Sequence, residues 1–204
     1  LVDQRGIREI QCVGLGPDGQ RATESYVVAS DGALANAFVY VKTGLDGRSF
    51  PIPAEPVVLD QQKCWYVPRV VGVRVGQSFQ VLNSDPLLHN VRSASTVNAP
   101  FNQGQPIQGI RYSHTFSAEE VMVPFKCDVH AWMNAWVGVM NHPYFAVTGA
   151  DGAFSLPNLP AGTYTVEATI NNGLNQQVSD PVDTVLTFVA PNLTVNKTVK
   201  PTSK

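Results

Sequence analysis

The chain has 204 residues, which is enough for one large domain or two small domains with real hydrophobic cores. Charged residues make up only 15% of it, the formal net charge is -2, and no basic run or stripe typical of nucleic-acid binding occurs. No apolar run approaches the roughly 18 residues that a membrane-spanning helix needs. The sequence therefore predicts neither a nucleic-acid-binding protein nor a protein with a membrane-spanning helix.

Short β-rich runs separated by glycine, proline, asparagine and aspartate follow one another along the chain. The runs are 37–41, 70–75, 78–82, 112–116, 121–125 and 137–140. No segment shows helical periodicity over more than a couple of turns. Short strands at such intervals are typical of a sandwich, so the pattern predicts an all-β fold.

Four residues with metal-binding side chains stand at informative spacings. Cys127, His130 and Met133 form a C-x2-H-x2-M loop directly after one predicted strand, and His89 follows another strand upstream. Copper alternates between a +1 state that prefers sulfur and a +2 state that prefers nitrogen and oxygen. Two imidazoles, one thiolate and a weak axial thioether serve both states. The residues therefore predict one type 1 copper ion, with Met133 as the axial ligand. The alternative is that they are ordinary core residues, as isolated cysteines and methionines usually are.

This ligand loop resembles the short, amicyanin-like loop of the cupredoxins, which implies a Greek-key β-sandwich that carries electrons. By that resemblance, Asn90 ties the two ligand-bearing segments together. Phe125 alternates with Cys127 on the approach strand, so we expect it to face the core beside the site. The resemblance also places Ala131 and Trp132 near a partner-docking face, with His130 as the exit for the electron.

Three cysteines are present, and a metal-bound Cys127 leaves Cys12 and Cys64 free to pair. Such a bridge would close a loop of about 50 residues and contribute about 4 kcal/mol on the chain-entropy model. Two buried free thiols are the alternative. Because disulfides persist in oxidising compartments, the bridge predicts an extracytoplasmic location.

The pattern changes after residue 142. Residues 145–156 read as two strands joined by a turn at Asp151-Gly152, and further strands are predicted within 159–168 and 182–189. This string resembles the carboxypeptidase regulatory-like domains, which are small transthyretin-like β-sandwiches, and a fold of this kind says little about function.

The predicted organisation has four parts. We expect an N-terminal strand and arm (1–29), a cupredoxin-like copper domain (30–142), a carboxypeptidase regulatory-like sandwich (143–190) and a polar tail (191–204). Residues 37–41 could belong to either sandwich. Together the two domains resemble bacterial periplasmic proteins described as methylamine-utilisation-like or plastocyanin-like, which implies a periplasmic protein whose signal peptide has been removed.

The sequence predicts an electron carrier rather than an enzyme, with a redox protein such as a c-type cytochrome as its partner. Four histidines are too few for a multicopper oxidase, and no G-x-S-x-G or H-E-x-x-H motif occurs. A second hypothesis is a structural or interaction subunit of a larger extracytoplasmic assembly, in which copper is absent or incidental. Copper storage or delivery ranks last, because only three methionines are present.

Overall fold

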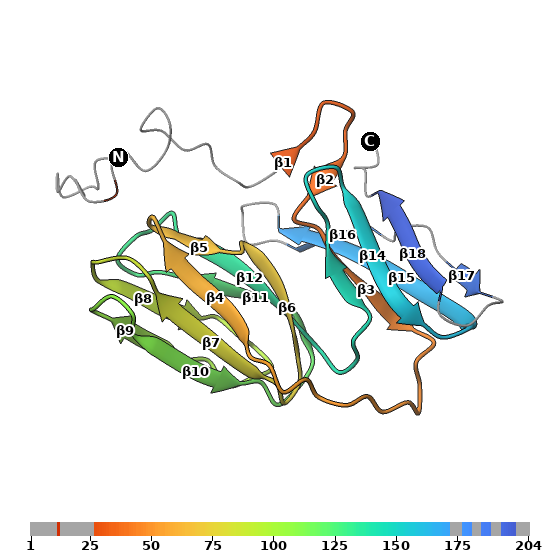
Figure 1. The fold of residues 1–204 in the computed structure, drawn as a ribbon, viewed down its shortest axis with the longest axis horizontal. Coiled ribbons are helices and arrows are strands. Elements are labelled where there is room, and N and C mark those ends of the chain that lie inside the picture. Colours follow the sequence, from red (N-terminus) through yellow and green to blue (C-terminus); the bar gives the residue numbers. More distant parts are fainter. Residues whose placement is uncertain (1–11, 13–26, 172–176, 181–184, 189–192, 199–204) are drawn as a thin grey trace.

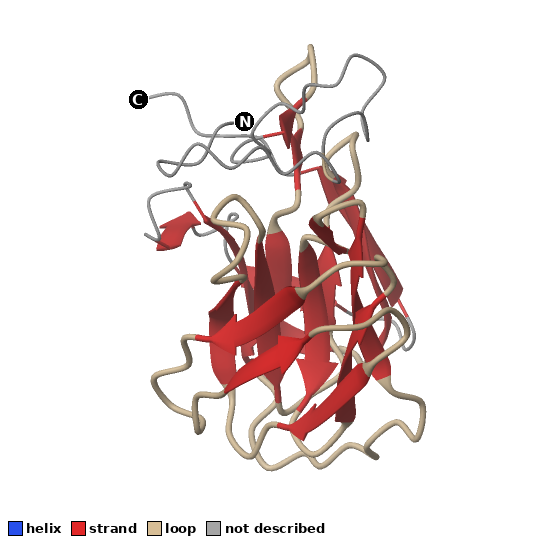
Figure 2. Cartoon of the chain, turned by 90° about the vertical axis from the view of Figure 1, so that its left-hand side faces the viewer, coloured by secondary structure: helices blue, strands red, loops and turns tan. Residues whose placement is uncertain are grey.

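The computed structural model describes residue 12 and residues 27–171, 177–180, 185–188 and 193–198. Every regular element in these ranges is a β-strand, which confirms the predicted all-β class (Figures 1 and 2). Within the same ranges no helix is long and apolar enough to cross a membrane.

Two sheets face each other in the first sandwich. One has the order β10-β7-β4-β5 and the other the order β6-β12-β11-β8-β9, and the β4–β7 and β6–β12 pairs are parallel. The strands are β4 (Val57–Gln62), β5 (Trp65–Val67), β6 (Val70–Arg74), β7 (Ser78–Asn83), β8 (His89–Ser93), β9 (Asn102–Gln105), β10 (Arg111–Thr115), β11 (Glu120–Lys126) and β12 (Asn134–Met140).

Alternation of side chains builds the core between these sheets. On β7, Phe79, Val81 and Asn83 are buried while the residues between them are partly exposed, as expected for a strand with one face on the core. On β12, six successive residues from Ala135 to Met140 are buried. A run buried on both sides requires a second layer against the outer face of this sheet.

A sheet outside the first sandwich, called the second sheet from here on, supplies that layer. Its order is β13-β3-β15-β16, with β17 also pairing β15, and the pairs β14–β18 and β1–β2 complete the described strands. The strands are β1 (Val27–Val28), β2 (Leu34–Ala35), β3 (Phe38–Thr43), β13 (Phe145–Val147), β14 (Ala153–Leu159), β15 (Gly162–Asn171), β16 (Gln177–Asp180), β17 (Val185–Phe188) and β18 (Leu193–Thr198).

The hydrogen bonding differs from the predicted division of the chain at two places. β3, which the sequence left open between the two sandwiches, pairs with β13 and β15 and so belongs to the second sheet. β18, inside the predicted polar tail, pairs with β14. Most of the predicted N-terminal arm, residues 1–11 and 13–26, lies outside the described residues.

Two glycines on β6 and β12 let the second sheet pack closely against these strands. Gly72 and Gly138 are register partners on the neighbouring strands β6 and β12. A Cβ on Gly72 would lie 2.2 Å from the Phe145 ring, and one on Gly138 would lie 2.2 Å from the Phe38 ring. The two rings stack with centroids 5.7 Å apart. They therefore sit directly on the glycine backbone, among the buried side chains Tyr40, Val70, Met122, Trp136 and Met140.

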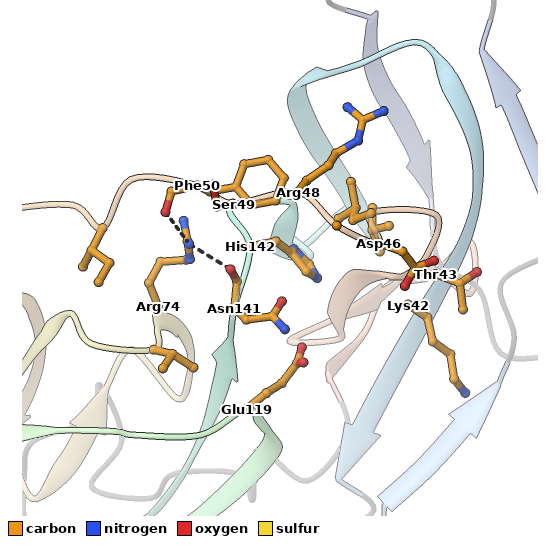
Figure 3. Close-up of a pocket in the computed structure, with 15 residues that line it drawn as sticks. Lys42, Thr43, Asp46, Arg48, Ser49, Phe50, Arg74, Glu119, Asn141 and His142 are labelled. Carbon is orange, nitrogen blue, oxygen red and sulfur yellow. Dashed lines mark hydrogen bonds between the residues drawn. The ribbon is translucent and has the colours of Figure 1, made fainter.

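A cleft of about 580 Å³ lies at the edge of this junction, where the loop between β3 and β4 passes the end of β12 (Figure 3). Arg74 lines it, and the Arg74 guanidinium donates to the carbonyl oxygens of Phe50, Pro51 and Asn141. His142 lies in the same cleft, and its Nδ1 accepts the Tyr144 N–H at 3.2 Å. Arg74 therefore fastens the connecting loop to the central sheet.

The glycine contact gives a stability prediction. In Gly138→Ala the added methyl must displace the Phe38 ring, which should lower the free energy of unfolding by about 1–3 kcal/mol through overpacking. Gly104→Ala is the matched control, because a Cβ there meets nothing within 4 Å. Urea denaturation of both variants measures the difference. The Phe38→Leu/Gly138→Ala double variant should show a smaller loss than the sum of the single variants, and strict additivity would contradict the contact.

Candidate metal centre

The end of the first sandwich brings the predicted ligand residues together. β11 pairs with β8, and β11 also pairs with β12, so the loop after β11 returns beside the start of β8. The two Nδ1 atoms of His89 and His130 are 2.9 Å apart, and Cys127 Sγ is 3.6 Å from His130 Nδ1. The donor atoms of these three side chains all lie within 4.8 Å of one another.

Short hydrogen bonds shape the ligand loop. Met133 N–H donates to the His130 carbonyl at 2.9 Å, and Cys127 N–H donates to the Met133 carbonyl at 3.2 Å. The His130 N–H also donates to Cys127 Sγ at 3.4 Å. The loop is thus a closed turn that points the sulfur and the imidazole toward the same space.

Asn90 connects the start of β8 to the loop that follows β11. Its Oδ1 accepts the Asp128 N–H at 2.9 Å, while its Nδ2 donates to Asn102 Oδ1. Because Asn90 follows His89 and Asp128 follows Cys127, this amide ties the start of β8 to the ligand loop.

Burial decides the protonation of the site. The exposed fractions are 0% for His89, 3% for Cys127, 2% for His130 and 0% for Met133. Burial lowers the pKa of His89, and burial together with the neighbouring His89 lowers the pKa of His130 to about 4. Burial raises the pKa of the Cys127 thiol. Both imidazoles are therefore neutral at pH 7, and a metal ion must displace the thiol proton in order to bind.

Two further predicted residues lie in the core below the site. Met133 ends the ligand loop as a fully buried side chain of the first sandwich. The Phe125 ring packs edge-on against Phe79 and Phe101, with centroids 5.6 and 5.7 Å away. These contacts hold the end of β11, and with it Cys127, against the core.

The sequence prediction missed Asp85. Its Oδ2 lies 2.8 Å from His89 Nε2, and its two oxygens accept the backbone N–H groups of Lys63 and Cys64 at 2.7 Å each. Asp85 therefore contacts both a predicted ligand and the turn between β4 and β5. The spacing of four residues between Asp85 and His89 was the available signal.

A buried group of amide side chains supports the segment that carries Asp85 and His89. Asn83 Nδ2 donates to the carbonyls of Leu87 and Gln105, and Asn83 Oδ1 accepts the Asp85 N–H. Gln61 donates to Gln105 Oε1 between the sheets. All three amide side chains are fully buried. These polar residues stand at positions where the alternation of side chains along a strand predicts core residues, which was a further signal of a functional site.

The predicted disulfide is present and lies over His130. Cys12 and Cys64 are bonded with their Cα atoms 5.9 Å apart, and both sulfurs lie within 4.8 Å of a ring nitrogen of His130. The Trp132 ring packs on His130 with centroids 5.3 Å apart, and its indole N–H donates to the Cys64 carbonyl at 3.1 Å. Ala131 is exposed. The imidazole expected to be the electron's exit is thus covered by Trp132 and the Cys64 turn.

The donor set fits one soft or borderline transition metal. Neutral imidazole nitrogens suit copper, zinc, iron and nickel, whereas a thiolate selects for copper, zinc or iron–sulfur clusters. Nδ1, Nδ1 and Sγ converge from three side chains, and no carboxylate belongs to this three-residue group. These three side chains could hold a metal ion with nitrogen and sulfur donors.

No protein family and no curated protein matches the sequence of this chain. Solved structures do match about half of it. A copper-containing nitrite reductase (NirK) from Thermus scotoductus matches with 18% identity and a TM-score of 0.41, over 49% of this chain and 26% of the reductase. The match thus spans about a quarter of the reductase.

Two small proteins match over nearly their whole length. Amicyanin from Paracoccus versutus has 21% identity and a TM-score of 0.38 over 50% of this chain and 96% of the amicyanin. A purple cupredoxin from Nitrosopumilus maritimus has 23% identity and a TM-score of 0.35 over 43% and 99%.

The buried histidines predict how stability depends on pH. His130 and His142 both have a pKa lowered to about 4, chiefly by burial. Between about pH 6.5 and pH 4 the unfolded chain binds protons that the folded chain does not. The free energy of unfolding of the metal-free protein should therefore fall as the pH falls through that range, by up to roughly 3 kcal/mol for each histidine.

Urea denaturation at pH 7 and pH 4.5 measures this loss. His130→Asn and His142→Asn should each lose less stability between the two pH values than the native chain does. An undiminished loss in both variants would contradict the assignment of the pH dependence to these two groups.

Proposed function

We propose that the chain is an extracytoplasmic blue copper protein that carries single electrons between redox proteins. One type 1 copper ion would be held by His89, Cys127 and His130, with Met133 as the weak axial ligand. The observation that carries this proposal is the convergence of the two Nδ1 atoms and Cys127 Sγ within 4.8 Å in a buried space. When bound, copper supplies the one-electron couple between its +1 and +2 states.

The protein residues supply rigidity and exclusion of water. Asn90 and the hydrogen bonds of the 127–133 loop fix the separation of the ligand side chains before a metal arrives. Electron transfer is fast when little rearrangement accompanies the change of oxidation state, and a site with both sulfur and nitrogen donors in a fixed frame meets that requirement. Because both buried imidazoles are neutral, no imidazolium cation has to be deprotonated before a metal binds.

The architecture and location belong to the same proposal. The first sandwich would be a cupredoxin-like module, and the second sheet with β14 and β18 a carboxypeptidase regulatory-like module. The Cys12–Cys64 disulfide supports an extracytoplasmic, and in a bacterium periplasmic, location. A c-type cytochrome is a partner of suitable chemistry, and it would dock near Ala131 and Trp132.

The first test is an absorption and EPR spectrum of the purified protein before and after one equivalent of Cu(II). We expect an intense sulfur-to-copper charge-transfer band in the visible region and a narrow copper hyperfine splitting, with one copper ion per chain. Cys127→Ser should abolish the band. No band in the native protein would overturn the proposal and favour a structural subunit in which copper is absent.

The assignment of Met133 as the axial ligand can be tested against a second, equally buried methionine. Met133→Leu should raise the reduction potential, because loss of a thioether donor disfavours the +2 state. Met140→Leu is the control, since Met140 is equally buried but packs in the junction with the second sheet. Protein-film voltammetry measures both. Equal potentials in the two variants would exclude Met133 as a ligand.

Trp132 tests the route by which electrons leave. Trp132→Ala should slow electron exchange with a c-type cytochrome while leaving the copper spectrum nearly intact, because the ring covers His130 without belonging to the donor set. Val97→Ala is the control, since Val97 is 60% exposed in the loop that follows the far end of β8. Stopped-flow mixing measures the rates. An unchanged rate in Trp132→Ala would place the exit elsewhere.

A further inference from the structure

Asp85 contacts two parts of the site at once. One of its oxygens, Oδ2, lies 2.8 Å from His89 Nε2 and 2.7 Å from the Cys64 backbone nitrogen, while Oδ1 accepts the Lys63 N–H at 2.7 Å. Asp85 is itself only 7% exposed. Its backbone N–H donates to Asn83 Oδ1 at 3.0 Å, which holds it in the buried amide group.

These contacts assign the ring protons of the metal-free site. Both Asp85 oxygens accept backbone N–H groups and so act as acceptors, which places the proton between Asp85 Oδ2 and His89 on His89 Nε2. His89 Nδ1 then carries a lone pair. It lies 2.9 Å from His130 Nδ1, and a contact of this length between two ring nitrogens needs one donor. His130 Nδ1 therefore carries the proton and donates it to His89.

The same carboxylate fixes the cover over His130. The Lys63 and Cys64 residues that it binds both have positive φ angles, 53° and 58°, in the turn between β4 and β5. Non-glycine residues adopt this region only where the surroundings hold them. Cys64 carries the disulfide, and its carbonyl accepts the Trp132 indole N–H. The Asp85 carboxylate thus links the first histidine to the turn that covers the second.

We propose that Asp85 is a positioning residue of the metal centre. It presents His89 Nδ1 as a lone pair to the site, and it holds the disulfide-bearing turn over His130. This inference rests on the proposed function for its importance in metal binding, but the arrangement of protons and hydrogen bonds that it describes belongs to the metal-free protein. The proton that His130 Nδ1 donates to His89 Nδ1 keeps the two rings together, and His130 would take the Nε2-protonated tautomer, with its proton moved to Nε2, when its Nδ1 binds a metal.

The test is ¹⁵N-edited NMR of the histidine rings in the metal-free protein at pH 7.5. In the native chain we expect a protonated Nε2 and an unprotonated Nδ1 on His89, and a protonated Nδ1 on His130. In Asp85→Ala the His89 proton should redistribute between the two nitrogens. Ser84→Ala is the matched control, because it removes the neighbouring hydrogen bond to Asp60 without touching His89. A protonated Nδ1 on native His89, or an unchanged tautomer in Asp85→Ala, overturns the proposal.

Amide hydrogen exchange tests the second contact. The Lys63 and Cys64 amides should exchange at least about tenfold faster in Asp85→Ala than in Ser84→Ala. Asp85→Asn keeps the size of the side chain but leaves one acceptor oxygen for three donors, so it should show an intermediate effect and serves if Asp85→Ala does not fold. Equal exchange in all variants would refute the role in holding the turn.

Copper titration separates this inference from the proposed function. If the native protein forms the type 1 site, Asp85→Ala should lower its copper affinity by about 10–100-fold, as removal of outer hydrogen-bond partners generally does, with a shift in the EPR spectrum. An unchanged affinity and spectrum would overturn the positioning role. If the native protein binds no copper, the proposed function fails, and the NMR and exchange results still decide what Asp85 does in the folded chain.

Discussion

The site depends on the exclusion of water from a cluster of polar side chains. Two imidazoles, a thiol, a carboxylate and several amides lie at the end of the first sandwich almost without exposure. Burying such groups is unfavourable unless each finds a partner. Hydrogen bonds of Gln61 Nε2, Asn83, Gln105, Asn90 and Asp85 meet most of that requirement, while Gln61 Oε1 is buried without a hydrogen-bond partner among the described residues. The cluster of His89, Cys127 and His130 and the amide and carboxylate side chains that form hydrogen bonds around it are therefore one connected unit.

This unit is fixed from both faces of the central sheet. On the inner face, Phe125 and its aromatic neighbours hold the end of β11. On the outer face, Phe38 and Phe145 pack on the glycines of β6 and β12. The strand that leaves the ligand loop, β12, is consequently buried on both sides. Densely packed interiors deform little, and a ligand loop attached to such a strand keeps its geometry when the charge of the site changes.

Local patterns in the sequence predicted those features of the fold that depend on residues close together in the chain. Alternation along β7 and the C-x2-H-x2-M spacing predicted strands and a ligand loop, and the structure brings Cys127, His130 and His89 together. Pairings between distant segments could not be predicted from the sequence. Nothing in residues 38–43 states that their partners lie in β15 rather than in the next strands. The cover over His130 combines Cys12, Cys64 and Trp132 from three segments, and their proximity is a property of the folded chain alone.

The pairing of β3 makes the first sandwich an insertion within the second. The chain forms β3, leaves to build β4 to β12, and returns to place β13 beside β3. The two crossing points are adjacent, since Val41 N–H donates to the Tyr144 carbonyl at 3.0 Å. Close ends are the condition under which one domain tolerates another inside it. During synthesis the inserted module can close while β3 still lacks β13 and β15, so the cluster of His89, Cys127 and His130 can form before the sheet that flanks it. Excision of the insert by recombination would leave a continuous second module, but would expose the apolar face of β3 and β13 that packs on β6 and β12.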